Sequence, residues 1–213
     1  MGKRPGCDIY WRRLAGSHPF DKIIITCNRL RETQYKILHR LHITPVVLHK
    51  INPSISPLCI KCCSERGTYF HCFWECKLIS KFWTFISKEI SGIFKINIKK
   101  DPGVFLLGLP SRELHLPVSY YKLLDKLLLI ARKCILHNWI KDVPPSATIW
   151  YREIFSNLPH ERLQAVLKGK EEFFVKIWSP FLNYLPAELK SIILMGKQFS
   201  DWKKSVNRSC NSE

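Results

Sequence analysis

Five of the nine cysteines crowd into the segment Cys59–Cys76, together with His71. Thiolate and imidazole groups are the ligands that zinc prefers, and a structural zinc site holds four of them in a tetrahedron. Two cysteines separated by two residues can turn tightly enough to present both sulfurs to one ion. A segment that brings four side chains to one point has little freedom to fold in another way. The spacing therefore predicts a zinc-binding site.

Six groups compete for the four ligand positions. One arrangement is Cys-x2-Cys-x8-His-x4-Cys, whose ligands are Cys59, Cys62, His71 and Cys76. Cys63 can replace Cys62 in a Cys-x3-Cys-x7-His-x4-Cys arrangement. Cys72 is another rival, because it lies four residues before Cys76 and would share its face of a helix. The remaining alternative is a set of metal-free thiols, with Cys72 packed in the core.

Helical phase limits where His71 can lie. Five residues along an α-helix turn the side chain by about 140°, so His71 and Cys76 cannot both point inward from one regular helix. We therefore expect His71 to lie before the following helix or in a distorted first turn. Gly67 is expected to turn the chain back toward His71 with a positive φ.

The rest of the chain predicts a mainly α fold, a helical domain with a small zinc-nucleated Cys/His module. Apolar residues recur at three- and four-residue steps from Leu78 to Ile93, which predicts an amphipathic helix. A helix over about 29–43 should end at Pro45, and another should run over about 119–141 with Ser119 as N-cap and Trp139 on its inner face. We expect Val104–Leu107 to form a short strand or turn, Ile23–Thr26 to form another, and short helices near 147–157, 161–167, 171–178 and 187–195.

Four regions follow from these elements. Residues 1–28 form an N-terminal segment without a clear pattern, 29–95 carry a basic helix and the zinc module, 96–195 form a helical C-terminal region, and 196–213 form a flexible basic tail. No apolar run of about 18 residues exists to span a bilayer. No apolar segment follows the basic start, so we expect a cytoplasmic or nuclear protein that is not secreted. The scattered Cys7, Cys27, Cys134 and Cys210 are expected to be small buried or idle thiols.

The formal net charge of +17 points to a polyanionic partner. Solubility alone needs a net charge of roughly 2–8. We expect RNA, and possibly DNA, as the partner, and no membrane. The predicted contacts are basic residues that bind phosphate and an aromatic residue that stacks on bases: Arg29, Arg31, Tyr35, Lys36, Arg40, Lys50, Lys61 and Arg66. Trp74, Trp83 and Trp139 lie in apolar stripes and are expected in the core instead.

These motifs resemble the C-terminal zinc-binding region of LINE-type non-LTR retrotransposon reverse transcriptases. The resemblance rests on Cys59-x2-Cys62, Gly67-Thr68, His71, Phe73-Trp74-x-Cys76 and Phe82-Trp83, with support from the segment Tyr35–Pro45 and from Trp139, Pro144-Pro145, Trp150 and Lys170–Pro180. It covers roughly residues 29–185. It implies Cys59, His71 and Cys76 as zinc ligands with either Cys62 or Cys63. Many members have glycine at the position of Cys63, so we expect Cys62.

The resemblance also implies a tail that helps to bind element RNA beside a polymerase and an endonuclease. Polymerases of this family need two adjacent aspartates for catalytic metal ions, and no two of the six aspartates here are adjacent. A zinc hydrolase would need an open ligand position and a general base, for which only Glu65 and Glu75 lie nearby. We therefore expect a protein without enzymatic activity. The alternative from another class is a helical protein–protein interaction module derived from a retroelement, whose partners the sequence leaves unknown.

Overall fold

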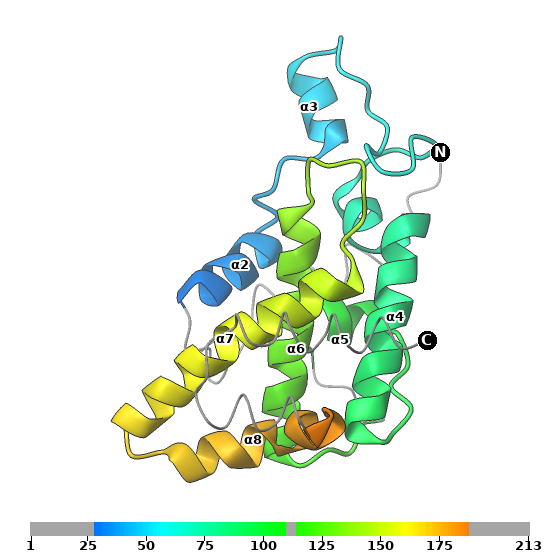
Figure 1. Cartoon of the computed structure of the whole chain (residues 1–213). Helices are drawn as coiled ribbons and strands as arrows, with labels where there is room; N and C mark the ends of the chain where they lie inside the picture. The colour runs from blue at the N-terminus through cyan, green and yellow to red at the C-terminus, as the bar shows by residue number, and fades with distance from the viewer. Residues whose placement is uncertain (1–27, 110–113, 188–213) are drawn as a thin grey trace.

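The central helix of this fold is α6, against which the other long helices pack. The computed structural model describes residues 28–109 and 114–187, and Figure 1 shows their arrangement. Over those ranges the elements are α2 (Asn28–Leu38), α3 (Pro45–Ile51), the π turn η2 (His71–Glu75), α4 (Lys77–Phe94), α5 (Pro102–Leu107), α6 (Val118–His137), α7 (Ala147–Leu167) and α8 (Glu171–Tyr184). The predicted mainly α fold is confirmed.

Helix α6 is apolar on more than one face, which explains its central place. It contacts α2, α4, α5, α7 and α8. Leu124, Leu128, Ala131 and Ile135 are buried along one face, and Leu123, Leu127, Ile130 and Cys134 are buried on other sides. A helix that is hydrophobic nearly all round belongs inside a helical bundle. Trp139 lies beyond the end of this helix and is half-buried.

Helix α4 follows the cysteine cluster directly and fixes it to the bundle. Its predicted apolar stripe is confirmed, because Ile79, Phe82, Trp83, Ile86, Ile90 and Ile93 are all buried. It packs against α6, α7 and α8 as well as against η2. The buried face of α4 therefore sets the position from which Cys76, at its N-terminus, reaches the cluster.

Two predictions about the ends of helices are wrong, one about Pro45 and one about Ser119. Pro45 does not end a helix but begins α3, where Thr44 is the N-cap and its Oγ1 accepts a hydrogen bond from the backbone N of Val47 at 3.3 Å. Proline suits the first helical turn, because the N–H that it lacks has no partner there. Helix α2 ends earlier, at Leu38. Ser119 is not the N-cap of α6 either, since Pro117 holds that position and Ser119 is buried within the helix.

Three further boundaries differ from the prediction. Val104–Leu107 belongs to α5, which is capped by Asp101 through a 2.9 Å hydrogen bond from the backbone N of Val104 to Oδ1. Pro159 lies inside a single helix α7, and Pro180 lies inside α8. Helix α8 buries apolar residues on both sides of Pro180, whereas α7 buries apolar residues before Pro159 and the ion-paired Glu161 after it. These buried contacts offset the hydrogen bond that each proline removes. The elements predicted near 23–26 and 187–195, and the segments 1–28 and 196–213, lie largely outside the described residues.

Among the described helices, none combines the length and the apolar character that crossing a membrane requires.

Candidate metal centre

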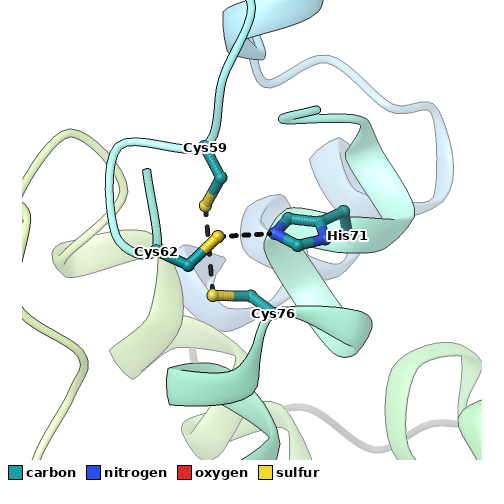
Figure 2. A group of neighbouring side chains, drawn as sticks. All are labelled: Cys59, Cys62, His71 and Cys76. Carbon is teal, nitrogen blue, oxygen red and sulfur yellow. Dashed lines mark hydrogen bonds between the residues drawn. The ribbon is translucent and has the colours of Figure 1, made fainter. Parts of the chain in front are cut away.

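Cys59, Cys62, His71 and Cys76 converge on one point, as Figure 2 shows. Their ligand atoms all lie within 4.8 Å of one another. The Sγ atoms of Cys59 and Cys76 are 3.9 Å apart, and Sγ of Cys62 lies 3.3 Å from Nε2 of His71. Tetrahedral zinc with bonds of about 2.3 Å to sulfur and about 2.0 Å to nitrogen separates two sulfurs by about 3.8 Å and sulfur from nitrogen by about 3.5 Å. The four groups can therefore hold a metal ion.

A tight hairpin presents the first two cysteines. The chain pairs across Pro57–Gly67 through a bridge between Leu58 and Arg66, with the backbone N of Cys59 donating to the carbonyl of Glu65 at 2.8 Å. A turn closes inside this hairpin, where the N–H of Cys63 donates to the carbonyl of Cys59 at 2.8 Å. The turn is the reason that a Cys-x2-Cys spacing can point both sulfurs to one side.

The π turn η2 resolves the conflict of helical phase between His71 and Cys76. The backbone N of Cys76 donates to the carbonyl of His71 at 2.9 Å, a bond that spans five residues where an α-helix spans four. Such a turn brings residue i+5 closer to the face of residue i than an α-helix does, and here both side chains face the same point. The prediction that His71 lies before the following helix, in a distorted turn, is confirmed. Thr68 caps the start of this segment, with its Oγ1 accepting from the N of His71 at 3.1 Å.

Trp83 supports the π turn from inside the core. A π turn leaves a carbonyl without its usual helical partner, and an unpaired buried carbonyl is costly. The indole Nε1 of Trp83 donates to the carbonyl of Phe73 at 2.7 Å, and the ring is 1% exposed. Helix α4 thus satisfies the backbone of the segment that carries His71.

The electrostatic surroundings favour a thiolate at Cys62. Partial burial acts to raise its pKa, but N–H groups of Ser64 and Glu65, the hydroxyl of Ser64 and the imidazole of His71 together lower the pKa to about 6. Burial raises the pKa of Cys76, and the backbone N–H groups of Leu78 and Ile79 oppose that rise. Both sulfurs therefore face N–H groups two and three residues further along the chain. Such groups stabilise the ionised ligand that a metal needs.

The two rival cysteines do not belong to this cluster. Cys63 is exposed, and its Sγ contacts the carbonyl of Ile60 at 3.4 Å. Its φ of 52° lies in the left-handed region that favours glycine. Cys72 is buried, and burial raises its pKa to about 12, which disfavours the thiolate. Of the six candidates, the structure therefore brings together Cys59, Cys62, His71 and Cys76.

Gly67 is required for a different reason than predicted. Its φ is not in the left-handed region; instead, a Cβ on Gly67 would lie 2.6 Å from Cγ of Pro45. The carbonyl of Gly67 also accepts from the backbone N of Val46 at 3.4 Å. The backbone of the hairpin at Gly67 therefore packs directly against the ring of Pro45 at the start of α3.

An aromatic cluster joins the metal-binding module to the basic segment before it. Tyr69 donates its hydroxyl to the carbonyl of Ile37 at 3.1 Å, and its ring lies 4.9 Å from that of Phe73. Trp139 lies 4.9 Å from Phe73 and donates Nε1 to the carbonyl of Ile43 at 2.7 Å. No local pattern in the sequence predicts this cluster, because Trp139 is far from Tyr69 and Phe73 in the chain.

The predicted nucleic-acid contacts differ in how far their side chains are exposed. Most are exposed around α2, α3 and the hairpin, namely Arg31, Tyr35, Arg40, Lys50 and Arg66. Lys36 is half-buried in an ion pair with Glu32 on the same helix, and Arg29 lies in α2 at a position where no side chain is described.

Lys61 differs from the other predicted contacts because it is tied to the end of α6. Its Nζ donates to the carbonyls of Asn138 at 2.6 Å, Trp139 at 3.3 Å and Lys141 at 2.9 Å. Burial lowers the pKa of Lys61, while the nearby Cys59, Cys72 and Cys76 oppose that shift. An ammonium group has three donors, and here three carbonyls receive them. Lys61 therefore fastens the hairpin to the bundle, and we do not retain it among the phosphate contacts.

A groove of about 720 Å³ opens beside the cluster, lined among others by Phe70, Trp74, Glu65 and Glu75. Both carboxylates that the sequence offers near the cysteines therefore face one space next to Cys62 and His71. A scan of the sequence against models of known protein families finds no match. The interpretation of this site therefore rests on its own geometry.

Proposed function

We propose that Cys59, Cys62, His71 and Cys76 bind one structural Zn²⁺, and that the zinc-stabilised module presents a basic surface to nucleic acid, with RNA as the principal partner and DNA as a second. The observation that carries this proposal is the convergence of three sulfurs and one imidazole within 4.8 Å. Zinc is the metal that best suits a tetrahedral set of this composition.

A structural role for the ion follows from the number of ligands. Four protein ligands complete a tetrahedron and leave no position for water or substrate. Glu65 and Glu75 line the adjacent groove, but without an open position they have no metal-bound water to activate. We therefore propose no enzymatic activity for this chain.

The metal would hold the basic surface in place through the aromatic cluster. His71 and Cys76 flank Phe73, and Phe73 packs on Tyr69 and Trp139, which bond to the backbone at Ile37 and Ile43. Those carbonyls lie at the end of α2 and just before α3, the two helices that carry Arg31, Tyr35 and Lys50. Exposed cations of this kind contact phosphates without regard to sequence.

The resemblance to the zinc-binding region of LINE-type reverse transcriptases supports the same function. Two features fit that resemblance. The ligand set uses Cys62, and Cys63 has the left-handed φ of a position at which many members have glycine. On this proposal the chain is the non-catalytic tail of such a protein.

A second candidate function is protein docking, and one observation favours it. Large apolar side chains are exposed on α3 and the loops next to it, including Ile51 at 71% and Ile140 at 80% exposure. Surfaces of this kind often mark contacts with other proteins. In this case the basic charge would be incidental to binding.

The salt dependence of RNA binding separates the two functions. We expect the zinc-loaded chain to bind a single-stranded RNA with an affinity that falls linearly on a log–log plot against salt. Arg31→Ala and Lys50→Ala should each reduce the slope by about 1, whereas Lys88→Ala, at an exposed lysine of α4 outside the predicted set, should leave it unchanged. A slope near zero for the unmodified chain would rule out the nucleic-acid function and leave docking.

A further inference from the structure

A second region with the chemistry of a binding site lies at the other end of the molecule from α3. It is a pocket of about 160 Å³ that α6, α7 and α8 line. Figure 1 draws α8 near the bottom of the view and α3 at the top. The lining comes from the first half of α6, the end of α7 and the start of α8. None of the residues predicted from the sequence to bind metal or nucleic acid lines it.

The charge of this pocket is strongly positive. Four lysines line it against a single carboxylate, Glu161, which gives a net charge of +3 from four positive groups less one negative group. Lys126 is buried and pairs with Glu161 at 2.6 Å, and Trp178 donates Nε1 to the same carboxylate oxygen at 3.1 Å. This pair is neutralised within the pocket wall. The charges left to attract an anion are those of Lys122, Lys168 and Lys170.

The same pocket offers an aromatic ring and an amide. Phe173 is 39% exposed, although most large aromatic residues around it are buried. The Nζ of Lys122 lies over the Phe173 ring, 4.5 Å from its centre, so this amine must move aside before a base can stack on the ring face that it covers. Gln164 adds a carboxamide, which can both donate and accept a hydrogen bond. Exposed aromatic rings among cations are the surfaces on which unpaired bases stack.

We propose that this pocket holds one unpaired base of a single-stranded nucleic acid, stacked on Phe173, with the flanking phosphates on Lys122, Lys168 and Lys170. Gln164 is placed to meet the edge of the base. The inference rests on the proposed nucleic-acid function and adds a second contact region to it. The groove beside the Cys/His cluster also has aromatic residues, but two carboxylates, Glu65 and Glu75, line it against one lysine, Lys77, and so it favours phosphates less.

The experiment compares two single-stranded oligomers of about twelve nucleotides, a length within the usual range of such sites. One is oligouridine, and the other is an abasic oligomer with the same sugar–phosphate backbone. Phe173→Ala in the full zinc-loaded chain should weaken binding of oligouridine by about 5-fold to 100-fold and leave the abasic oligomer unaffected, because one stacked base is lost. Val175→Ala, at an exposed apolar position of the same helix outside the pocket, is the matched control and should change neither affinity.

A second measurement uses the unmodified chain and so does not depend on how a variant folds. Oligouridine that carries 4-thiouridine should crosslink on irradiation to the peptide that contains Phe173.

Three results would each overturn the inference. The first is equal binding of oligouridine by the Phe173→Ala and unmodified chains, the second is equal weakening of both oligomers by this substitution, and the third is crosslinks confined to other peptides. If the unmodified chain binds oligouridine with a steep salt slope, such a result refutes the pocket alone. If it binds neither oligomer, the proposed function fails and the pocket fails with it.

Discussion

At the scale of single residues, the neighbouring cysteines Cys62 and Cys63 in the hairpin have different structural roles. Cys62 directs its sulfur to His71, while Cys63 points to the surface from a backbone conformation that suits glycine. The doubled cysteine is therefore one member of the Cys/His cluster followed by one turn residue. The distinction rests on φ and on the hairpin hydrogen bonds, neither of which the sequence displays.

The two cysteines should respond differently to substitution. We expect Cys62→Ser to lower the zinc affinity at least tenfold, because a hydroxyl is a poor ligand beside thiolates. Cys63→Gly should bind zinc as the unmodified chain does and unfold at the same or a higher temperature, because strain at a positive φ is removed. Competition with a coloured chelator measures both. Loss of zinc from Cys63→Gly with retention in Cys62→Ser would reverse the assignment.

Gly67 tests the contact between the hairpin and α3. An added Cβ would lie 2.6 Å from the ring of Pro45, so Gly67→Ala should reduce the free energy of unfolding by about 1–3 kcal/mol through overpacking. Gly92→Ala in α4 is the control. Its Cβ would lie 3.0 Å from Cε2 of Tyr184, a 41% exposed side chain held by one hydrogen bond from its hydroxyl to Glu89. A shift of a few tenths of an ångström relieves that contact, and alanine favours a helix. Urea unfolding that shows equal stability for the two variants would contradict this account of Gly67.

Asp125 provides a test that depends on pH. Burial raises its pKa to about 6, and Arg132 acts in the opposite direction. Between about pH 4 and pH 6 the native state then binds more protons than the unfolded state, so the free energy of unfolding falls as pH rises through this window. Asparagine has no ionisable carboxyl group, so the free energy of unfolding of Asp125→Asn does not fall for this reason. Its stability relative to the unmodified chain should rise by about 1–2 kcal/mol between about pH 4.5 and pH 7, measured by urea unfolding at each pH. No change with pH would show that Asp125 titrates normally.

At the scale of the elements, the π turn is the feature that makes the site possible. It lets two candidate ligands five residues apart face one point, and α4 holds it through the bond from Trp83 to the Phe73 carbonyl. The candidate metal site and the core therefore meet at this turn.

The indole bond can be tested against a matched tryptophan elsewhere in the core. Trp83→Phe and Trp150→Phe each remove a buried indole N–H that donates to a carbonyl, that of Phe73 in one case and Leu127 in the other. Both variants should lose about 1–3 kcal/mol of stability. Trp83→Phe alone should release zinc faster to a chelator under native conditions. Equal rates of zinc release from the two variants would show that the hydrogen bond from Trp83 does not stabilise the metal site.

Much of the fold could be predicted from the sequence, and the misses have a common physical cause. The stripe from Ile79 to Ile93 and the set of six candidate ligands follow from spacing, because periodicity and metal chemistry act locally. The expectation of Cys62 rather than Cys63 comes from the family resemblance and not from spacing. Pro45, Pro159 and Pro180 do not end helices, because capping at Thr44 and burial in α7 and α8 decide those boundaries. The role of Lys61 and the pocket between α6 and α8 depend on contacts between distant segments, which no local pattern contains.

At the scale of the whole molecule, two cationic regions lie at opposite ends of one helical bundle. One surrounds the metal centre on α2, α3 and the hairpin, and the other surrounds the pocket between α6, α7 and α8. In the part of the chain that the structure describes, each region combines cations with an exposed aromatic ring, Tyr35 in the first and Phe173 in the second. A single strand that contacts both would gain affinity from each.

The central claim is that Cys59, Cys62, His71 and Cys76 bind a structural zinc ion, and X-ray absorption at the zinc edge of the purified full chain tests it most directly. We predict one zinc per chain, coordinated by three sulfurs at about 2.3 Å and one nitrogen at about 2.0 Å, with no water ligand. Well under one zinc per chain, or a shell containing oxygen, would contradict the account.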